Sequence, residues 1–271
     1  MVASPAFNEV NQLAWRGGPP LPSSRAVAGE SAIALTYNGS SHAVMMATPA
    51  DLEDFAVGFS LTEGVIECST DIGSLELIES ELGIEARMWL DESRAARLRW
   101  RRRAIAGPVG CGLCGIESLE QACPVPPVVT SHASCHAQDL LNAMAKLAPL
   151  QRLNRVTHAM HGAAFWHPEH GIRLIREDVG RHNALDKLAG ALVRADVPRS
   201  EGALLLTSRV SVEIVQKAAM IAVPIIVAIS APTTLAIATA HRAGITLIAV
   251  ARDDGYEVFT HPERIIFSRS G

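Results

Sequence analysis

The second half of the chain alternates short apolar runs with amphipathic segments, and no other feature of the sequence constrains the fold as strongly. Three runs are apolar almost throughout and are predicted to be strands: 203–207, 225–229 and 245–250. The segments between them, 212–222 and 234–243, have the apolar spacing of helices. Apolar strands separated by helices are typical of a parallel sheet covered by helices. The pattern therefore predicts an α/β fold for this half of the chain.

The residues upstream of this alternation extend the same domain. Their pattern predicts a strand pair at 163–166 and 172–175, and helices at 134–150 and 181–194. The proline-rich run 124–127 interrupts the chain and marks a candidate domain boundary. We therefore assign residues 131–271 to a C-terminal domain.

The first half predicts a separate α+β domain over residues 26–130. Its expected elements are a hairpin turning at Asn38-Gly39, a helix capped by Thr48-Pro49 and ended by Gly64, and strands at 74–78, 85–90 and 97–105. Residues 1–25 are rich in Pro, Gly and Ser without periodicity, and we expect them to form a loosely held tail.

Polar residues follow each of the three predicted parallel strands. Ligands of open α/β sheets bind outside the carboxyl ends of the strands, and hydroxyls and arginines at helix starts suit a phosphate. Hydroxyls at these positions can also be ordinary helix caps. Together they favour an anion site built from Thr207, Ser208, Arg209, Ser230, Thr233 and Arg252. The sequence has no Walker lysine loop and no Gly-x-Gly-x-x-Gly opening, so the common nucleotide motifs do not explain this pattern.

A second polar cluster precedes the predicted helix 181–194. It contains Asp178, Arg181, His182 and Asn183. Such a cluster either holds a ligand or is a capped, salt-bridged helix start.

Cys111-Gly-Leu-Cys114 lies in a glycine-rich segment that follows the basic run Arg99–Arg103. A Cys-x-x-Cys pair can be a redox dithiol, half of a metal site or a nucleophilic sulfur carrier. The basic run is either the solvated face of a strand or a source of positive charge that lowers a thiol pKa.

The metal and redox alternatives are the less favoured ones. Zinc needs about four close ligands. Histidines such as His158 and His161 complete neither a second Cys-x-x-Cys nor the signature of zinc deaminases, so no metal is expected. The segment also lacks the βαβ context of thioredoxin-type dithiols.

Composition limits the partners and the compartment. The net charge of −4 over 271 residues gives no general attraction to nucleic acid or anionic membranes. The most apolar stretch, 218–231, is interrupted by Pro224 and is too short to span a bilayer. Five cysteines without a secretory signal indicate reduced thiols in the cytoplasm.

From about Glu30 to its end, the chain resembles the formate dehydrogenase accessory sulfurtransferase family (FdhD). The matching motifs lie at 47–54, 58–64, 111–115, 176–187, 207–209, 213–217 and 260–264. The resemblance implies an N-terminal α+β domain that carries the Cys-x-x-Cys loop and a cytidine-deaminase-like three-layer α/β/α C-terminal domain. It also implies a cytoplasmic homodimer.

The function implied by this resemblance is sulfur transfer. Such a protein takes persulfide sulfur from a cysteine desulfurase and passes it to the molybdenum bis(molybdopterin guanine dinucleotide) cofactor, which formate dehydrogenase needs for activity. By motif position, Cys111 would carry the persulfide and Cys114 would assist. The segment that binds the cofactor, or a GDP-like nucleotide in the same site, would be Val250, Ala251, Arg252, Asp253, Asp254 and Gly255.

The sequence departs from the family pattern at two places, and two other functions remain as alternatives. His158 and Ala159 stand where the family usually has two glycines, and Asp253 and Asp254 make the cofactor segment acidic. The rivals are a zinc-dependent deaminase-like hydrolase and a cofactor-insertion chaperone that carries no sulfur.

Overall fold

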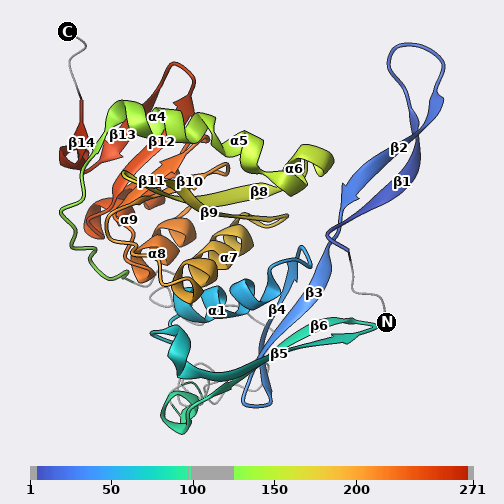
Figure 1. The fold of residues 1–271 in the computed structure, drawn as a ribbon, viewed down its shortest axis with the longest axis horizontal. Helices are drawn as coiled ribbons and strands as arrows, with labels where there is room; N and C mark the ends of the chain where they lie inside the picture. Colours follow the sequence, from blue (N-terminus) through green and yellow to red (C-terminus); the bar gives the residue numbers. More distant parts are fainter. Residues whose placement is uncertain (1–4, 97, 99–124, 268–271) are drawn as a thin grey trace.

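The structure, a computed structural model, describes residues 5–96, 98 and 125–267. Cys111, Cys114 and nearly all of the predicted strand 97–105 lie outside the described residues. Figure 1 shows two sheets with helices between them, and a two-stranded ribbon that extends away from both.

The C-terminal sheet has the order β13-β12-β11-β10-β8-β9. Its strands are β8 (His161–His167), β9 (Gly171–Asp178), β10 (Ala203–Leu206), β11 (Ile225–Ala228), β12 (Thr246–Arg252) and β13 (Gly255–Thr260). β10, β11 and β12 pair in parallel, as predicted, whereas β8, β9 and β13 add antiparallel edges. The sheet is therefore mixed, with a parallel centre.

Helices cover both faces of this sheet. The helices are α4 (Ala137–Ala145), α5 (Leu147–Leu150), α6 (Arg152–Thr157), α7 (Arg181–Arg194), α8 (Val212–Met220) and α9 (Thr234–Arg242). Successive residues of a strand point to opposite faces. In β10, Leu205 packs with Leu140 and Leu147 of α4 and α5, whereas Leu204 and Leu206 belong to the core under α7, α8 and α9. Helices, sheet and helices thus form three layers, as the family resemblance implies.

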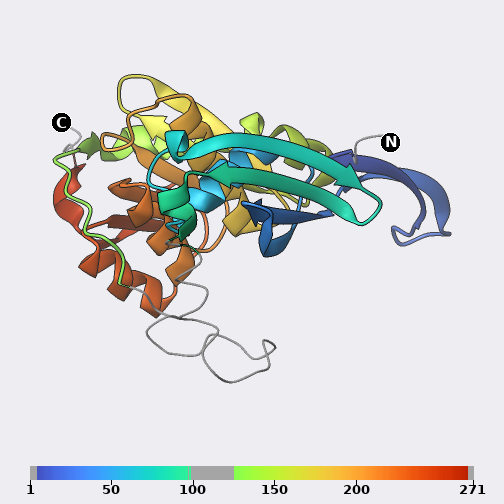
Figure 2. The same ribbon diagram turned by 90° about the horizontal axis from the view of Figure 1, so that it is seen from below.

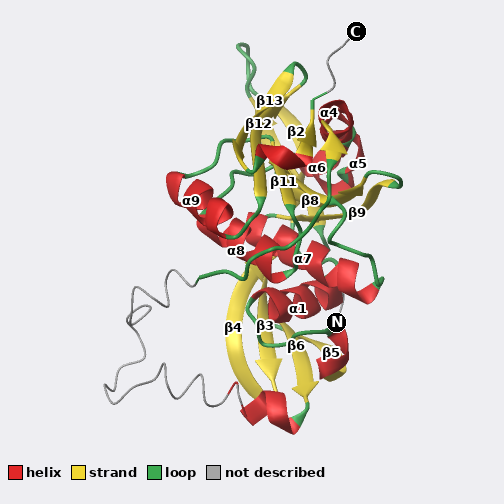
Figure 3. Ribbon diagram, turned by 90° about the vertical axis from the view of Figure 1, so that its left-hand side faces the viewer, coloured by secondary structure: helices red, strands yellow, loops and turns green. Residues whose placement is uncertain are grey.

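The N-terminal sheet has the order β4-β3-β6-β5. Its strands are β3 (Ser31–Tyr37), β4 (Ser40–Ala47), β5 (Ile72–Ser80) and β6 (Gly83–Leu90), and its helix is α1 (Leu52–Thr62). α1 lies between this sheet and α7, as Figure 3 shows. One hydrophobic cluster contains Ile33, Phe55, Leu188 and Leu206, so the core is continuous from one sheet to the other.

The crossing of α1 and α7 depends on two glycines. A Cβ atom on Gly58 would lie 1.7 Å from the carbonyl oxygen of Asp186, and one on Gly190 would lie 1.9 Å from that of Asp54. Real side chains cannot approach a backbone so closely. The sequence patterns Gly58-Phe59 and Ala189-Gly190 therefore set how near the two helices lie.

Residues 1–25 were expected to form a loosely held tail, and this expectation is wrong for residues 7–14 and 21–25, which belong to strands. They form an antiparallel hairpin of β1 (Phe7–Ala14) and β2 (Leu21–Ala28), paired over eight positions. Its base contacts α6, where Arg25 donates a hydrogen bond to the carbonyl of Thr157 at 3.3 Å. Backbone pairing does not require apolar periodicity, which explains why the sequence did not predict it.

Two other expectations need correction. The helix predicted at 134–150 is broken, because Pro149 has no N–H to donate and the segment divides into α4 and α5. Thr48 does not cap α1, which begins after Asp51. Instead, the Oγ1 of Thr48 accepts a hydrogen bond from the N–H of Val179 at 3.1 Å.

Sequence patterns also missed the short strands β7 (Cys135–His136) and β14 (Ile265–Ile266), which pair in parallel. Among the described residues, no helix is both long and apolar enough to cross a membrane.

Candidate functional site

The carboxyl ends of β10, β11 and β12 form one continuous edge. The N–H of Ile229 donates to the carbonyl of Leu206 at 3.0 Å, and the N–H of Thr233 donates to that of Val210 at 3.0 Å. The N–H of Val250 donates to the carbonyl of Ser230 at 3.5 Å. The predicted residues at the three strand ends are therefore neighbours, and α8 and α9 begin at the same edge.

Some of the predicted hydroxyls at this edge are already used within the protein. The Oγ1 of Thr207 accepts a hydrogen bond from the N–H of Gly162 at 2.8 Å. The Oγ1 of Thr233 caps α9 by accepting from the N–H of Ala236 at 3.2 Å. Ser208 is buried and donates to the carbonyl of Arg209, whose own side chain is exposed. A ligand here would meet Arg209 and Ser230 more readily than Thr207 or Ser208.

The segment 250–255 spans the end of β12, a turn and the start of β13. Val250 has a φ of 54°, in the left-handed region that a β-branched residue rarely adopts. Strained backbone of this kind is concentrated at functional sites. Arg252 donates to the backbone carbonyls of Ile229 and Ala251, which fixes its side chain across the strand ends.

A small cavity of about 220 Å³ lies beside this segment. Leu141, Met144, Ala145 and Ala148 line one side of it, and Ile229, Ala251, Arg252 and Asp253 line the other. The lining combines an apolar wall with one carboxylate and one guanidinium. Such a cavity suits a flat, partly apolar ring that carries hydrogen-bond donors.

His182 and His161 lie at the start of α7 and of β8. The Nε2 of His182 is 3.4 Å from the Oγ of Ser211 and 3.9 Å from a carboxylate oxygen of Glu213. Burial, followed by the positive charge of Arg181, lowers the pKa of both imidazoles. Both rings are therefore neutral at pH 7 and can accept as well as donate hydrogen bonds.

A mostly apolar cavity of about 330 Å³ has His182 in its wall. It lies between α1, α7 and α8, and its other lining residues include Met45, Phe59, Met220 and the segment 125–127. Residue 125 is the first described residue after the cysteine-containing segment. The cavity is thus lined by the chain that leads away from Cys111 and Cys114.

A buried ion pair forms the floor of this cavity. The Nζ of Lys217 lies 2.9 and 3.1 Å from the two carboxylate oxygens of Asp186, and 3.0 Å from Glu63 and from Thr62. Burial disfavours the charge on Lys217, but Asp186 and Glu63 outweigh it and raise the pKa of the ammonium. Lys217 therefore remains charged, with its donors directed at acceptors of α1 and α7.

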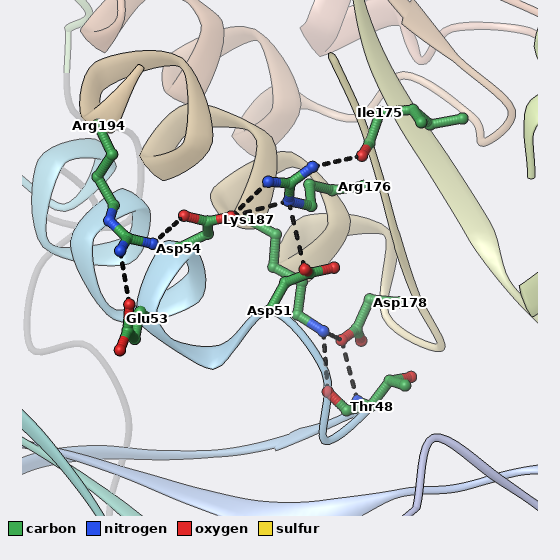
Figure 4. Close-up of polar contacts among 9 residues, drawn as sticks. All are labelled: Thr48, Asp51, Glu53, Asp54, Ile175, Arg176, Asp178, Lys187 and Arg194. Atoms are coloured by element: carbon green, nitrogen blue, oxygen red, sulfur yellow. Dashed lines mark hydrogen bonds and ion pairs between the residues drawn. The ribbon is translucent and has the colours of Figure 1, made fainter. Parts of the chain in front are cut away.

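A second network, part of which is drawn in Figure 4, joins α1 to β9 and α7. The Nζ of Lys187 lies 2.7 Å from Asp178 and donates to the carbonyl of Thr48 at 2.8 Å. Asn183 donates to Asp178 at 3.0 Å and to the carbonyl of Met46 at 2.9 Å. The amide of Asn183 is thus engaged in this network, while its neighbour His182 lines the cavity.

The same figure shows a second carboxylate held by two arginines. Asp54 accepts from Arg176 at 2.6 and 2.8 Å and from Arg194 at 2.5 Å. Sequence reasoning did not select Asp54, Asp186 or Lys217.

The described cysteines are Cys68, which is exposed, and Cys135, which is buried. Burial raises the pKa of the Cys135 thiol to about 12, so it is a poor nucleophile. Among the described residues, the histidines and carboxylates close enough to share a metal ion are His167, Glu169 and His170. They lie at the β8–β9 turn, at the opposite end of β8 from His161.

Comparisons with known proteins give a consistent picture. A model of the FdhD/NarQ family matches residues 28–266. The sulfur carrier protein FdhD of Agrobacterium fabrum is 52% identical over 262 residues, which are 96% of this chain and 97% of the relative. The protein of the same name from Cupriavidus necator is 47% identical over 251 residues, 93% of this chain and 87% of the relative. A crystal structure from Desulfotalea psychrophila, described as a candidate formate dehydrogenase accessory protein, has a TM-score of 0.74 and 25% identity and covers 97% of this chain and 100% of that chain.

Proposed function

Because the chain belongs to the FdhD/NarQ family, whose relatives are named sulfur carrier proteins, we propose that it carries sulfur for the maturation of formate dehydrogenase. The donor is a cysteine desulfurase, and the acceptor is the molybdenum bis(molybdopterin guanine dinucleotide) cofactor of the formate dehydrogenase catalytic subunit. The protein acts in the cytoplasm as a homodimer. The observation that carries this proposal is the 52% identity to a sulfur carrier protein over 96% of this chain. The neighbouring polar strand ends, which could bind an anion, support it.

The loading step is a thiol–persulfide exchange on Cys111. Its thiolate attacks the terminal sulfur of the donor persulfide, the S–S bond of the donor breaks, and the donor cysteine leaves as a thiolate. Cys111 then holds the sulfur as a persulfide, and no oxidant or reductant is consumed. Cys114 assists the exchange.

The strand edge would hold the anionic cofactor as substrate. Its phosphate groups would contact Arg209, Ser230 and the backbone N–H groups at the starts of α8 and α9. His182 lies at the start of α7, at the same end of the C-terminal sheet. In this proposal, sulfur is carried between the cavity beside His182 and the strand edge.

The small cavity beside Asp253 suits the guanine of the dinucleotide. Guanine presents two adjacent N–H donors, which one carboxylate can accept, and its flat face can pack on Leu141 and Met144. We expect Asp253→Ala to weaken GDP binding about 10-fold or more, the loss of charge-assisted hydrogen bonds. Asp254→Ala is the matched control. Calorimetric titration with GDP and with ADP measures the affinity of both variants. Equal GDP affinity in wild type and Asp253→Ala would remove Asp253 from the site.

Intact mass spectrometry tests the sulfur-carrier function. After incubation with a cysteine desulfurase and cysteine, the wild type should gain about one sulfur atom that is lost on reduction. Cys111→Ala should gain none, whereas Cys68→Ser, at an exposed cysteine of the described part, should load normally. A reducible gain of sulfur that persists in Cys111→Ala would show that another residue is the carrier.

The rival functions give different results with the same proteins. A chaperone that carries no sulfur would still activate formate dehydrogenase fully when Cys111 is replaced by Ala. A zinc-dependent hydrolase would purify with about one tightly bound zinc per chain.

A further inference from the structure

The hairpin of β1 and β2, here called the arm, exposes an unusual amount of apolar surface. Seven of the eight residues of β1 and six of the eight residues of β2 are exposed. Near its free end, Leu13 is 71%, Trp15 is 72% and Leu21 is 66% exposed. Figures 1 and 2 show the arm projecting beyond both sheets.

The apolar side chains lie on both faces of the arm. Leu13 is paired with Pro22, whereas Leu21 is paired with Ala14 one position further along. Because side chains alternate along a strand, Leu13 and Leu21 point to opposite faces. A two-stranded ribbon is only marginally stable by itself in water, so this exposed apolar surface favours packing of the arm against a partner.

The size of the arm matches one side of a stable interface. A standard interface uses roughly 20–30 residues from each partner. The arm spans residues 7–28, and its only charged residues are Glu9, Arg16 and Arg25, of which Arg25 is bound to Thr157. With nearly balanced charge, the arm does not select an acidic or a basic partner, and burial of apolar surface is its main source of affinity.

The chain also presents a surface that can receive such an arm. The inner face of the N-terminal sheet packs on α1 through residues such as Met45 and Met88. Residues that alternate with these point outward, and among them Val44, Met46 and Trp89 are each at least 47% exposed. One chain therefore supplies both an apolar arm and an apolar sheet face.

We propose that the arm packs on the outer face of the N-terminal sheet of a second copy of this chain. Because each copy offers both surfaces, a two-fold exchange buries one apolar face of each arm on the sheet of the other copy and closes the assembly as a dimer. This inference rests on the homodimer of the proposed function and specifies its interface, independently of sulfur transfer.

Light scattering after size-exclusion chromatography tests the proposal over a dilution series. The wild type should have twice the mass of one chain. Leu13→Asp with Leu21→Asp in the arm, and Val44→Asp with Met46→Asp on the sheet, should each halve the mass. Leu82→Asp is the matched control, because Leu82 is 92% exposed at the β5–β6 turn and its variant should remain dimeric.

The outcomes are distinguishable. A monomeric wild type overturns the homodimer itself, whereas a dimeric arm variant leaves the homodimer and overturns the role of the arm. Monomeric arm variants with dimeric sheet variants overturn the receiving face. Because the substituted side chains are exposed, circular dichroism should show all variants folded, and persulfide loading of Cys111 should report the proposed function separately.

Discussion

Buried charges distinguish α7 from an ordinary amphipathic helix at the scale of single residues. Lys187 and Asp178 are both completely buried, and their charged groups form an ion pair at 2.7 Å. Asp178 also accepts from the N–H groups of Thr48 and Gly180 at 2.9 and 2.7 Å. Burial lowers the pKa of the Lys187 ammonium, and Asp178 opposes that effect. The motif 176–187 is therefore as much a structural element as a ligand site.

Removing one member of this pair should lower the free energy of unfolding. Lys187→Met leaves the carboxylate of Asp178 buried without its cation, and we expect a loss of about 3–5 kcal/mol in the free energy of unfolding. Urea denaturation followed by circular dichroism measures it. Glu53→Gln, at the exposed end of the neighbouring network, is the control and should cost about 0–1 kcal/mol. A Lys187→Met protein as stable as Glu53→Gln would show that the buried pair contributes little.

At the scale of elements, the close crossing of α1 and α7 should be sensitive to any side chain larger than glycine. Gly58→Ala or Gly190→Ala adds a methyl group within 2 Å of a backbone carbonyl, so the helices must separate. Ala favours a helix over Gly by about 1 kcal/mol, but overpacking costs about 1–3 kcal/mol or more. We expect both variants to unfold at lower urea concentration than the wild type.

The control for this crossing is Gly18→Ala, where the added Cβ atom meets nothing within 4 Å. It should leave the midpoint of unfolding unchanged. Midpoints of Gly58→Ala and Gly190→Ala that equal the wild type would mean that the helices pack less closely than the structure shows.

Elements with strong periodicity could be predicted from sequence, and others could not. Runs such as 203–206 and 225–228 are apolar throughout, so burial alone identified the parallel strands. The arm is paired by backbone hydrogen bonds and exposed on both faces, so its side chains carry no burial pattern.

In the candidate site, the polar residues at the strand ends were predictable because each group follows an apolar run. The cavity beside His182 was not, because its walls come from α1, α7, α8 and 125–127, which only tertiary packing brings together.

At the scale of the whole molecule, the two predicted domains share one core. The cluster that contains Ile33 and Phe55 continues through Leu185 to Leu206 and Ile226 without interruption. Two ion-pair networks add to this core. The one centred on Asp178 joins α7 and β9 to Thr48, just before α1. The one centred on Asp186 joins α7 to α8 and, through Thr62, to α1. A shared core of this kind indicates that neither sheet unfolds before the other.

This continuity predicts a single cooperative unfolding transition. Trp89 lies in β6 and Trp166 in β8, so each reports on one sheet. With Trp15 and Trp100 replaced by Phe, two proteins that retain only Trp89 or only Trp166 should show coincident urea transitions by fluorescence. Two separated midpoints would mean that the domains unfold independently. Coincidence in these proteins, lost when Gly58→Ala is added, would identify the α1–α7 crossing as the coupling between the sheets, because that substitution acts only where the two helices meet.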